Sequence, residues 1–535
     1  MISLKIVALV SLIYFGILFG VAYFADRQRE RGRSLIDNPS VYSLSLAVYC
    51  TSWTFYGSVG RAATTGIDFL TIYLGPTLMA FTWWFLLRKM VRISKEQKLT
   101  SIADFISSRY GKSPMLGAIV TVFVVLGIMP YIALQLKAVA RSFDLLVYPL
   151  STNNTMHVLP KLDLHFDSAL AVALILGLFG VLFGARRLDT SGRHEGLVAA
   201  IALESLVKIV AFVAAGLFVT YGLFDGFTDI FHDFLVRFPE REYLLRLGTE
   251  ENSYAHWLAM TVISMMAVMF LPRQFHIMVI ENCREEHIRK AMWRFPAYMF
   301  VINLFVIPIA LAGLLLGNGD THNADFFVLT IPLQYGQPWL AMLVFIGGFS
   351  ASAGMVMVSS VALSTMILNH LVIPIILKFH SKAQNLSTLL VNLKRIGIIA
   401  VILLGYIYYR FLGESAALVN IGLISFVAAT QFAPAVIGGL YWRQATQRGA
   451  TTGLVLGFIV WFYTLLVPSF VQSGWIGPEI VNQGLLGLAL LKPTELFGLS
   501  GFDIWTHALF WTIFFNLGSY LAISLLTSPH EEEQE

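Results

Sequence analysis

The sequence predicts an all-α protein that crosses a membrane many times. Of its 535 residues, 57% are hydrophobic and only 13% are charged, and the mean hydropathy is +0.72. Soluble domains carry about 25% charged residues, so this chain cannot cover a surface that faces water. Its apolar residues also gather in runs close to the roughly 20 residues that a helix needs to cross a bilayer. The chain is therefore expected to be a polytopic membrane protein.

Apolar runs of this kind predict about 13 transmembrane helices. They cover residues 4–24, 41–60, 67–87, 114–136, 168–185, 195–224, 255–281, 294–317, 338–377, 395–411, 415–441, 449–471 and 503–527. The first run is no cleavable signal peptide, because its apolar part from Ile6 to Phe24 is too long and arginines follow it. An odd number of spans places the two termini on opposite sides of the membrane.

Lysine and arginine gather in every second loop, and this alternation predicts the orientation. The rich loops are residues 25–40, 88–113, 186–194, 273–294, 378–395 and 442–448. Cytoplasmic loops of membrane proteins carry such an excess. We therefore expect the N-terminus outside and the C-terminus, with its polar tail 528–535, in the cytoplasm. The net charge of +4 is too small to indicate a nucleic-acid partner.

Two of the predicted spans look interrupted. The span 41–60 is weakly hydrophobic, with hydroxyl side chains through its middle and glycine at its end. The span 255–281 has a short uncharged stretch, Trp257–Pro272, before Arg273, Gln274 and His276. Secondary transporters repeat a five-helix unit in inverted orientation, with discontinuous helices at matching positions. The alternative, that these polar residues only ease helix packing, stays open.

The two interrupted spans lie five spans apart, which predicts how a single membrane domain, residues 1–535, is organised. Residues 41–224 would form the first five-helix repeat, and residues 255–441 the second, in opposite orientation. An extra first helix and basic cytoplasmic loop, residues 1–40, would precede them. Two additional helices, residues 449–527, would follow them.

Few other polar groups lie within the predicted spans. Glu204 and Lys208 are spaced i, i+4, which favours an intramembrane ion pair, either functional or structural. Cys50 and Cys283 form no disulfide framework and are expected to be free thiols. No phosphate-binding glycine loop or His-Glu-x-x-His helix is present, and the 12 histidines show no ligand spacing. The sequence therefore indicates neither an enzyme nor a cofactor.

Several motifs, in order along the chain, resemble the N-terminal transporter domain of CbrA-type sensor histidine kinases, which belongs to the sodium/solute symporter family. They are Tyr42–Tyr56, Ser101–Lys112, Pro130–Lys137, Glu204–Lys208, Leu271–His276, Val361–Met366, Gln431–Pro434 and Gly438–Trp442. The resemblance implies the LeuT-type fold of two inverted five-helix repeats, in the cytoplasmic (inner) membrane of a bacterium.

The resemblance also implies a substrate site between the unwound parts of the two interrupted spans. By that match, residues 51–53 fall on the first unwound segment and residues 272–276 on the second. The implied substrate contacts are Thr51, Ser52, Trp53, Tyr56, Tyr131, Phe270 and Gln274. Hydroxyls, an amide and aromatic rings suit a zwitterionic amino acid. CbrA-type proteins are associated with histidine, which is therefore the expected substrate.

For the coupling cation, the resemblance implies backbone carbonyls of Ala47 and Cys50 with two hydroxyls from the span 338–377, such as Ser359 and Ser360. In another register of that span, Gly354 and Met355 occupy the hydroxyl positions, and neither offers a side-chain oxygen to a hard cation. Sodium and proton coupling therefore both remain open.

Two functions follow from the resemblance. The chain is expected to be a cation/amino-acid symporter linked to two-component signalling. Alternatively, it is a slowly transporting or non-transporting solute sensor. In either case a histidine kinase module and a response regulator are the implied partners. CbrA-type proteins continue into a kinase module, whereas this sequence ends at Glu535 without one.

Overall fold

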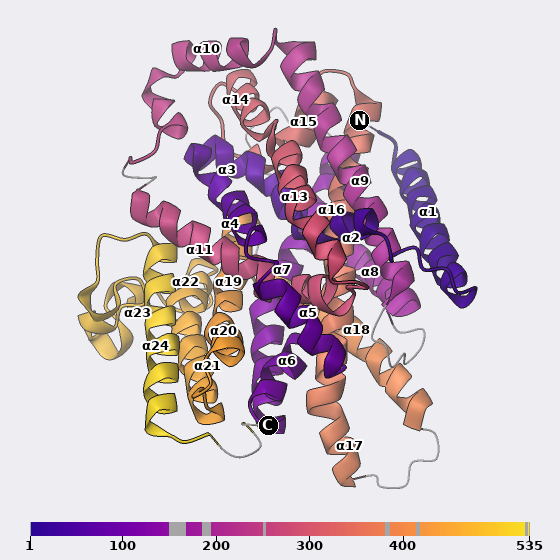
Figure 1. Cartoon of the computed structure of the whole chain (residues 1–535). Coiled ribbons are helices and arrows are strands. Elements are labelled where there is room, and N and C mark those ends of the chain that lie inside the picture. The colour runs from indigo at the N-terminus through magenta and orange to yellow at the C-terminus, as the bar shows by residue number, and fades with distance from the viewer. Residues whose placement is uncertain are drawn as a thin grey trace.

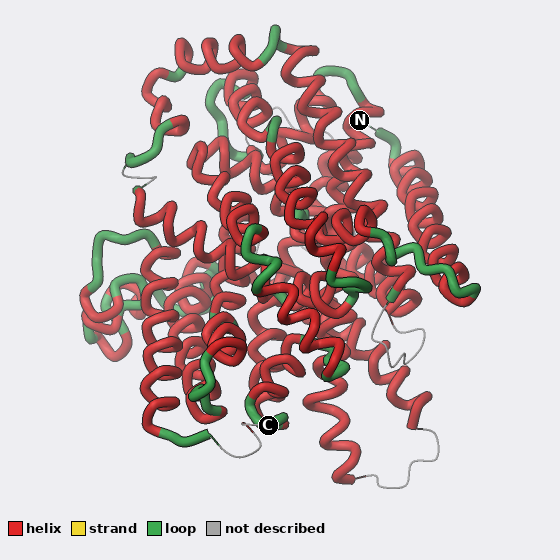
Figure 2. Tube along the Cα trace, viewed as in Figure 1, coloured by secondary structure: helices red, strands yellow, loops and turns green. Residues whose placement is uncertain are grey.

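The computed structural model describes residues 2–148, 167–184, 194–249, 253–379, 386–412, 418–529 and 533. Figure 2 shows helices and connecting loops, and no strand, in these ranges. The expected all-helical fold is confirmed. Expected features at residues 149–166, 185–193, 250–252, 380–385, 413–417 and 530–532 lie outside the described residues.

The described residues in the first half of the chain fold into nine α-helices. They are α1 (Leu4–Glu30), α2 (Pro39–Ser45), α3 (Ser58–Thr65), α4 (Thr71–Ala80), α5 (Leu86–Glu96), α6 (Ile102–Arg109), α7 (Pro114–Val147), α8 (Ser168–Gly184) and α9 (Glu195–Leu217). Short stretches of other helical geometry connect some of them, among which η1 (Leu46–Tyr49) and η2 (Trp53–Gly57) follow α2.

The second half forms fifteen further helices over the described residues. They are α10 (Phe227–Arg237), α11 (Tyr254–Phe270), α12 (Pro272–Phe275), α13 (Glu286–Asn303), α14 (Val306–Leu316), α15 (Phe327–Gln334), α16 (Pro338–Ile367), α17 (Ile373–Phe379), α18 (Leu386–Leu412), α19 (Leu418–Thr430), α20 (Ala433–Tyr441), α21 (Gln447–Trp461), α22 (Val467–Gln472), α23 (Glu479–Asn482) and α24 (Ile504–Leu526). The segment η6 (His276–Ile280) continues α12.

Nine helical stretches in the described residues are long and apolar enough to cross a membrane, and a bent pair, α11 with α12 and η6, brings the number to ten. The other expected spans, 41–60, 67–87 and 168–185, correspond to helices that are shorter or interrupted. The chain therefore has the helices of a multi-pass membrane protein.

The helices pack side by side into one bundle (Figure 1). Helix α1 lies on one flank against α9, and α21 and α24 pair on the opposite flank. The two termini lie at opposite ends of the bundle (Figure 1). Helix α6 buries Ile102, Phe105 and Ile106 because it packs against α7 and α20.

The expected interruption of the span 41–60 is present. The chain leaves helical geometry at Cys50, whose ψ is 95°, and resumes it at Ser52. The unwound position is thus Cys50–Thr51, slightly earlier than the expected segment 51–53. An interruption inside a membrane leaves backbone groups unpaired, and these need partners from the protein.

The second interruption lies between α11 and α12, which are bent by 49° relative to one another. Leu271 has an extended ψ of 133° and separates them, and Pro272 is the first residue of α12. Proline fits this position because it lacks the N–H that a first helical turn leaves unpaired. The expected unwound segment 272–276 is therefore wrong in register, since these residues already form the second half-helix.

Close backbone approach holds the second broken helix against α4. A Cβ on Gly75 would overlap the Ser264 hydroxyl and lie 2.7 Å from the Met265 backbone nitrogen, both in α11. Small residues allow membrane helices to approach in this way. By contrast, a Cβ on Gly20 in α1 would meet nothing within 4 Å.

Gly75→Ala should lower the melting temperature (Tm) of the purified protein, because the added methyl group meets backbone that cannot yield cheaply; overpacking of this kind costs about 1–3 kcal/mol. Gly20→Ala is the matched control, since it adds the same methyl group to a helix with open space around it. A Tm for Gly75→Ala at or above that of Gly20→Ala would contradict the close contact.

Candidate functional site

The first interruption is surrounded by polar side chains from α7. Thr51 Oγ1 and the Tyr131 hydroxyl are hydrogen-bonded at 2.8 Å. The backbone N–H and the hydroxyl of Ser52 donate to Gln135 Oε1 at 3.2 and 2.7 Å. All four residues are buried. The structure thus brings Thr51, Ser52 and Tyr131 together as expected, with Gln135 as an additional member.

Aromatic rings cover this polar group. Phe426 of α19 stacks on Tyr131, with ring centroids 5.6 Å apart, and on Trp53, at 6.3 Å. A Cβ on Gly422 would lie 2.7 Å from Trp53 Cδ1, so glycine lets α19 approach this closely. Phe426 was not among the expected contacts, because nothing local in the sequence links α19 to the first interruption.

The second broken helix contributes Arg273 and Gln274 to the same region. The Arg273 guanidinium lies over the Tyr131 ring, 4.4 Å from its centroid. Gln274 Nε2 donates to the carbonyl of Leu46 at 3.1 Å, which joins the two broken helices. Sequence reasoning chose Gln274 and passed over Arg273. The available signal was a charged residue inside an apolar span, which is a functional candidate by default.

Two expected contacts lie elsewhere around the interruptions. Tyr56 faces α16, where a Cβ on Gly348 would overlap its hydroxyl, and the ring of Phe326, directly before α15, lies 5.1 Å from its own. Phe270 is fully buried in the last turn of α11, directly before the second break. Neither residue hydrogen-bonds to the Thr51, Tyr131 and Gln135 group within the described chain.

The expected cation ligands Ala47 and Cys50 have a partner from within the protein. Lys208 Nζ donates to the carbonyl of Ala47 at 2.6 Å and to that of Cys50 at 2.7 Å. Lys208 is buried in α9. Its ammonium group therefore occupies the position at which the resemblance implied a coupling cation.

The direct ion pair expected from the i, i+4 spacing of Glu204 and Lys208 is absent. Both carboxylate oxygens of Glu204 are buried and have no hydrogen-bond partner in the described part of the chain. The reason is that the Lys208 ammonium reaches the carbonyls freed by the break, although it still interacts electrostatically with Glu204. A Cβ on Gly354 of α16 would lie against Glu204 Oε2.

The hydroxyls suggested for the cation, Ser359 and Ser360, are both buried in α16. Ser360 donates to the carbonyl of Met357 at 2.9 Å, and Ser359 to the sulfur of Met355 at 3.7 Å. Both hydroxyls thus bond within their own helix.

Beyond the second broken helix, His276 and Glu281, which are five residues apart, form a cluster with His194, which is distant in sequence. Glu281 Oε1 accepts from His194 Nδ1 at 2.9 Å and lies 3.1 Å from His276 Nε2. The three ligand atoms lie within 4.8 Å of one another, so these residues could hold a metal ion. The sequence shows no ligand spacing here because only folding brings His194 near His276 and Glu281. Lys394 Nζ, 3.5 Å from His194 Nε2, disfavours a metal by adding a positive charge.

Burial lowers the pKa of His194, and the Lys394 charge adds to this, whereas the hydrogen bond to Glu281 opposes it. The backbone N–H of His194 also donates to Glu281, at 2.9 Å. The cluster therefore links the start of α9 to the end of η6 by hydrogen bonds, at one end of the second broken helix.

An ionic contact lies four residues after Glu281. Glu285 accepts from Arg88 at 2.8 Å and from Arg92 at 2.9 Å, both in α5. The hydrogen bonds from Arg92 and Arg88 lower the pKa of Glu285 to about 2, against a smaller opposing effect of burial.

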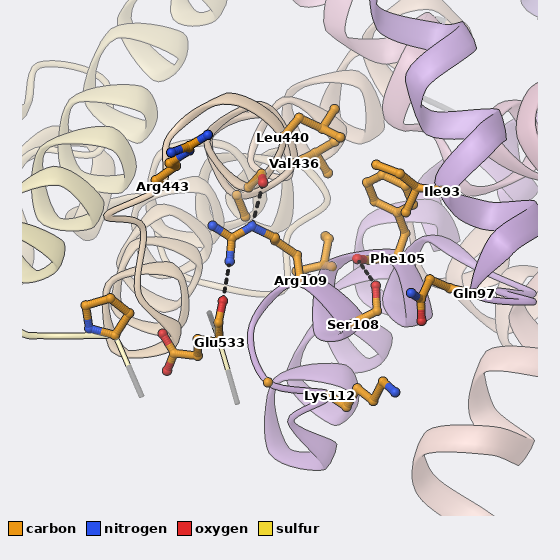
Figure 3. Close-up of a pocket in the computed structure, with 15 residues that line it drawn as sticks. Ile93, Gln97, Phe105, Ser108, Arg109, Lys112, Val436, Leu440, Arg443 and Glu533 are labelled. Carbon is orange, nitrogen blue, oxygen red and sulfur yellow. Dashed lines mark hydrogen bonds between the residues drawn. The ribbon is translucent and has the colours of Figure 1, made fainter. Parts of the chain in front are cut away.

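A cavity of about 1070 Å³ lies apart from this site, near the C-terminus (Figure 3). Its Arg109 donates to the carbonyls of Gly439 and Glu533 at 2.6 and 3.2 Å. Lys112 and Arg443 also line this cavity (Figure 3), which lies outside the region between the two broken helices.

Comparisons with known proteins show what this chain is similar to. The family model described as "Sodium:solute symporter family" matches residues 31–160. The uncharacterized symporter YhjB of Bacillus subtilis is 23% identical, over 86% of this chain and 88% of its own length. The uncharacterized symporter YodF of the same bacterium is 24% identical, over 83% and 82%.

A solved Na+-coupled sialic acid symporter in a substrate-bound, outward-open state has a TM-score of 0.62 and 13% identity. The alignment covers 97% of this chain and 99% of that one. At this identity the likeness shows a shared fold. The expected resemblance to sodium/solute symporters is confirmed, and the chain is a multi-pass bacterial membrane protein whose relatives are symporters and not enzymes.

Glu285→Gln should lower the Tm at neutral pH, because Arg88 and Arg92 lose their carboxylate partner. A carboxyl group with a depressed folded pKa contributes stability that is present above its ordinary value, about 4.3, and is lost as the pH falls toward 2. The difference in Tm between wild type and variant should therefore shrink between pH 5 and pH 3.

Glu242→Gln is the control, since Glu242 and Arg246 form an exposed pair that contributes little. A Tm difference for Glu285→Gln that is independent of pH would show that the ion pairs of Glu285 with Arg88 and Arg92 do not stabilise the protein.

Proposed function

We propose that this protein is a secondary symporter that carries a small solute together with a cation by alternating access. The shared transporter fold, the symporter relatives and the two broken helices support this. The observation that carries it is the Lys208 ammonium seated on the carbonyls of Ala47 and Cys50. That contact supports a cation position at the first break.

The proposed architecture is the LeuT-type pair of inverted repeats, residues 41–224 and 255–441, in about 13 spans. Residues 1–40 and 449–527 flank this core, in agreement with α1 and α24 on opposite flanks (Figure 1). The alternating basic loops place the N-terminus outside and the C-terminus in the cytoplasm, in the bacterial inner membrane.

Protons are the proposed coupling ions, with Lys208 as the carrier. A sodium ion at this position would compete with an ammonium group that already satisfies both carbonyls. Lysine can lose its proton when it is buried, and Glu204 one helical turn earlier is a nearby acceptor. Release of the proton would free the two carbonyls and loosen the first broken helix from α9. Sodium remains the alternative, as in the sialic acid symporter named above.

The proposed solute contacts are Thr51, Ser52, Trp53, Tyr131 and Gln274, to which the structure adds Gln135 and Phe426. A small amino acid fits this mixture of hydroxyl, amide and aromatic groups. Histidine is the proposed substrate on the resemblance to CbrA-type proteins, which is also the support for a kinase partner. Under the alternative proposal of a sensor, solute binds without accumulating.

Uptake of radiolabelled histidine into proteoliposomes tests this proposal, with sodium and pH gradients imposed separately. We expect accumulation that requires an inward proton gradient, is indifferent to sodium and collapses with a protonophore. Saturable binding without accumulation would favour the sensor, and accumulation driven by sodium alone would eliminate proton coupling.

Lys208→Arg should fold and bind solute but lose gradient-driven accumulation, because arginine keeps the positive charge and does not release its proton. Lys208→Gln should also lose accumulation, since it carries no proton. The measurement is uptake beside solute counterflow, which needs no net proton movement. Accumulation by Lys208→Arg at the wild-type rate would show that Lys208 is only structural.

A further inference from the structure

Within the described part of the chain, Arg273 is a buried charge without a counter-charge. It is 0% exposed, and none of its three guanidinium nitrogens has a hydrogen-bond partner in the described part of the chain. Its guanidinium lies on the Tyr131 ring, 4.4 Å from the ring centroid. Burying an unpaired charge is costly, so proteins rarely keep one without a use for it.

The chain treats its other buried arginine differently. Arg61 donates through Nε to Asp68 Oδ2 at 2.7 Å, and Nη2 bonds the same oxygen. His256 completes the group by bonding to the other oxygen of Asp68 at 3.0 Å. Arg61 thus has the carboxylate partner that a buried arginine usually needs, and Arg273 has none in the described part of the chain.

The neighbouring charges do not neutralise Arg273. Lys208, with which it interacts electrostatically, is a second cation, and its ammonium is held by uncharged carbonyls. The one buried carboxylate in this region, Glu204, interacts with Lys208 and lies against α16 at Gly354. The space between the two broken helices therefore lacks one negative charge.

We propose that the Arg273 guanidinium, lying on the Tyr131 ring beside the first interruption, binds the carboxylate of the transported solute. This rests on the proposed function, since it assumes that solute binds between the broken helices. A guanidinium binds a carboxylate through two parallel N–H donors. The three Arg273 nitrogens form no hydrogen bond in the described part of the chain, so their N–H groups are available to a solute.

The surroundings fit the rest of such a solute. Gln274 Oε1 is buried and also lacks a hydrogen-bond partner, so it can accept from an amino or hydroxyl group. Trp53 and Phe426 provide apolar surface for a small side chain or ring. The carboxylate is the obligatory group, and an amino group adds to the affinity without being required.

Thermal shift measurements on the purified full chain test the ligand side of the proposal. The probes are histidine, imidazolepropionate, which lacks the amino group, and histamine, which lacks the carboxylate; proline, lactate and acetate extend the set of carboxylates. We expect stabilisation by at least one carboxylate and none by histamine. Stabilisation by histamine equal to that by histidine, or by no carboxylate at all, would overturn the proposal.

Variants test the residue itself. Arg273→Gln should weaken carboxylate binding about 100-fold, as expected when one partner of a buried charge pair is removed. It should also raise the Tm of the ligand-free protein, because an unpaired buried charge is removed. Arg273→Lys should retain part of the binding, since it keeps the charge but loses the two-donor geometry.

Arg61→Gln is the matched control. It removes a buried arginine that has a carboxylate partner, so it should lower the Tm and leave the affinity of the folded protein unchanged. A fall in Tm for Arg273→Gln with wild-type affinity would show a structural arginine and refute the proposal. Because binding is measured without a gradient, failure of transport or of proton coupling is distinguishable from failure of the Arg273 site.

Discussion

Every helix that breaks inside a membrane must find partners for the backbone groups it releases, and this constraint governs the structure. At the first break the partners are side chains distant in sequence: Lys208 holds the carbonyls of Ala47 and Cys50, and Gln274 holds that of Leu46. Unsatisfied carbonyls in hydrocarbon would cost several kcal/mol each. The first break therefore depends on α9 and on the second broken helix. A movement of either one would change the hydrogen bonds to the carbonyls at the first break.

At the ends of the second broken helix the polar side chains have partners, whereas near its middle several lack partners in the described residues. At one end of α11, His256 joins Asp68 and Arg61, and beyond η6 Glu281 joins His194 and His276. Between these fixed ends, Arg273, Gln274 Oε1 and the Glu204 carboxylate lack partners in the described chain. This distribution holds the ends of the helix while its middle is left to exchange partners, which suits a site that must bind and release a solute.

The sequence predicts the elements well, because hydropathy and weakly apolar stretches are local properties. The bent helix at Leu271 and the break near Cys50 follow from them. Side-chain partners follow less well. The i, i+4 spacing suggested that Lys208 pairs with Glu204, yet the competing carbonyls come from a segment that only folding brings near. The buried cluster of His194, His276 and Glu281 is unpredictable for the same reason. Arg273 was visible as a residue, but its lack of a partner is a property of the folded chain.

Carboxylate binding at Arg273 and protonation of Lys208 would be coupled. Arg273 and Lys208 are cations that interact across the same small region, so each makes the other's charge less favourable. A carboxylate bound to Arg273 removes that repulsion and favours the protonated form of Lys208. Coupling between two ligands is reciprocal, so a proton on Lys208 must strengthen carboxylate binding by the same factor. A solute and a proton would then enter together, since each stabilises the form of the site that the other requires.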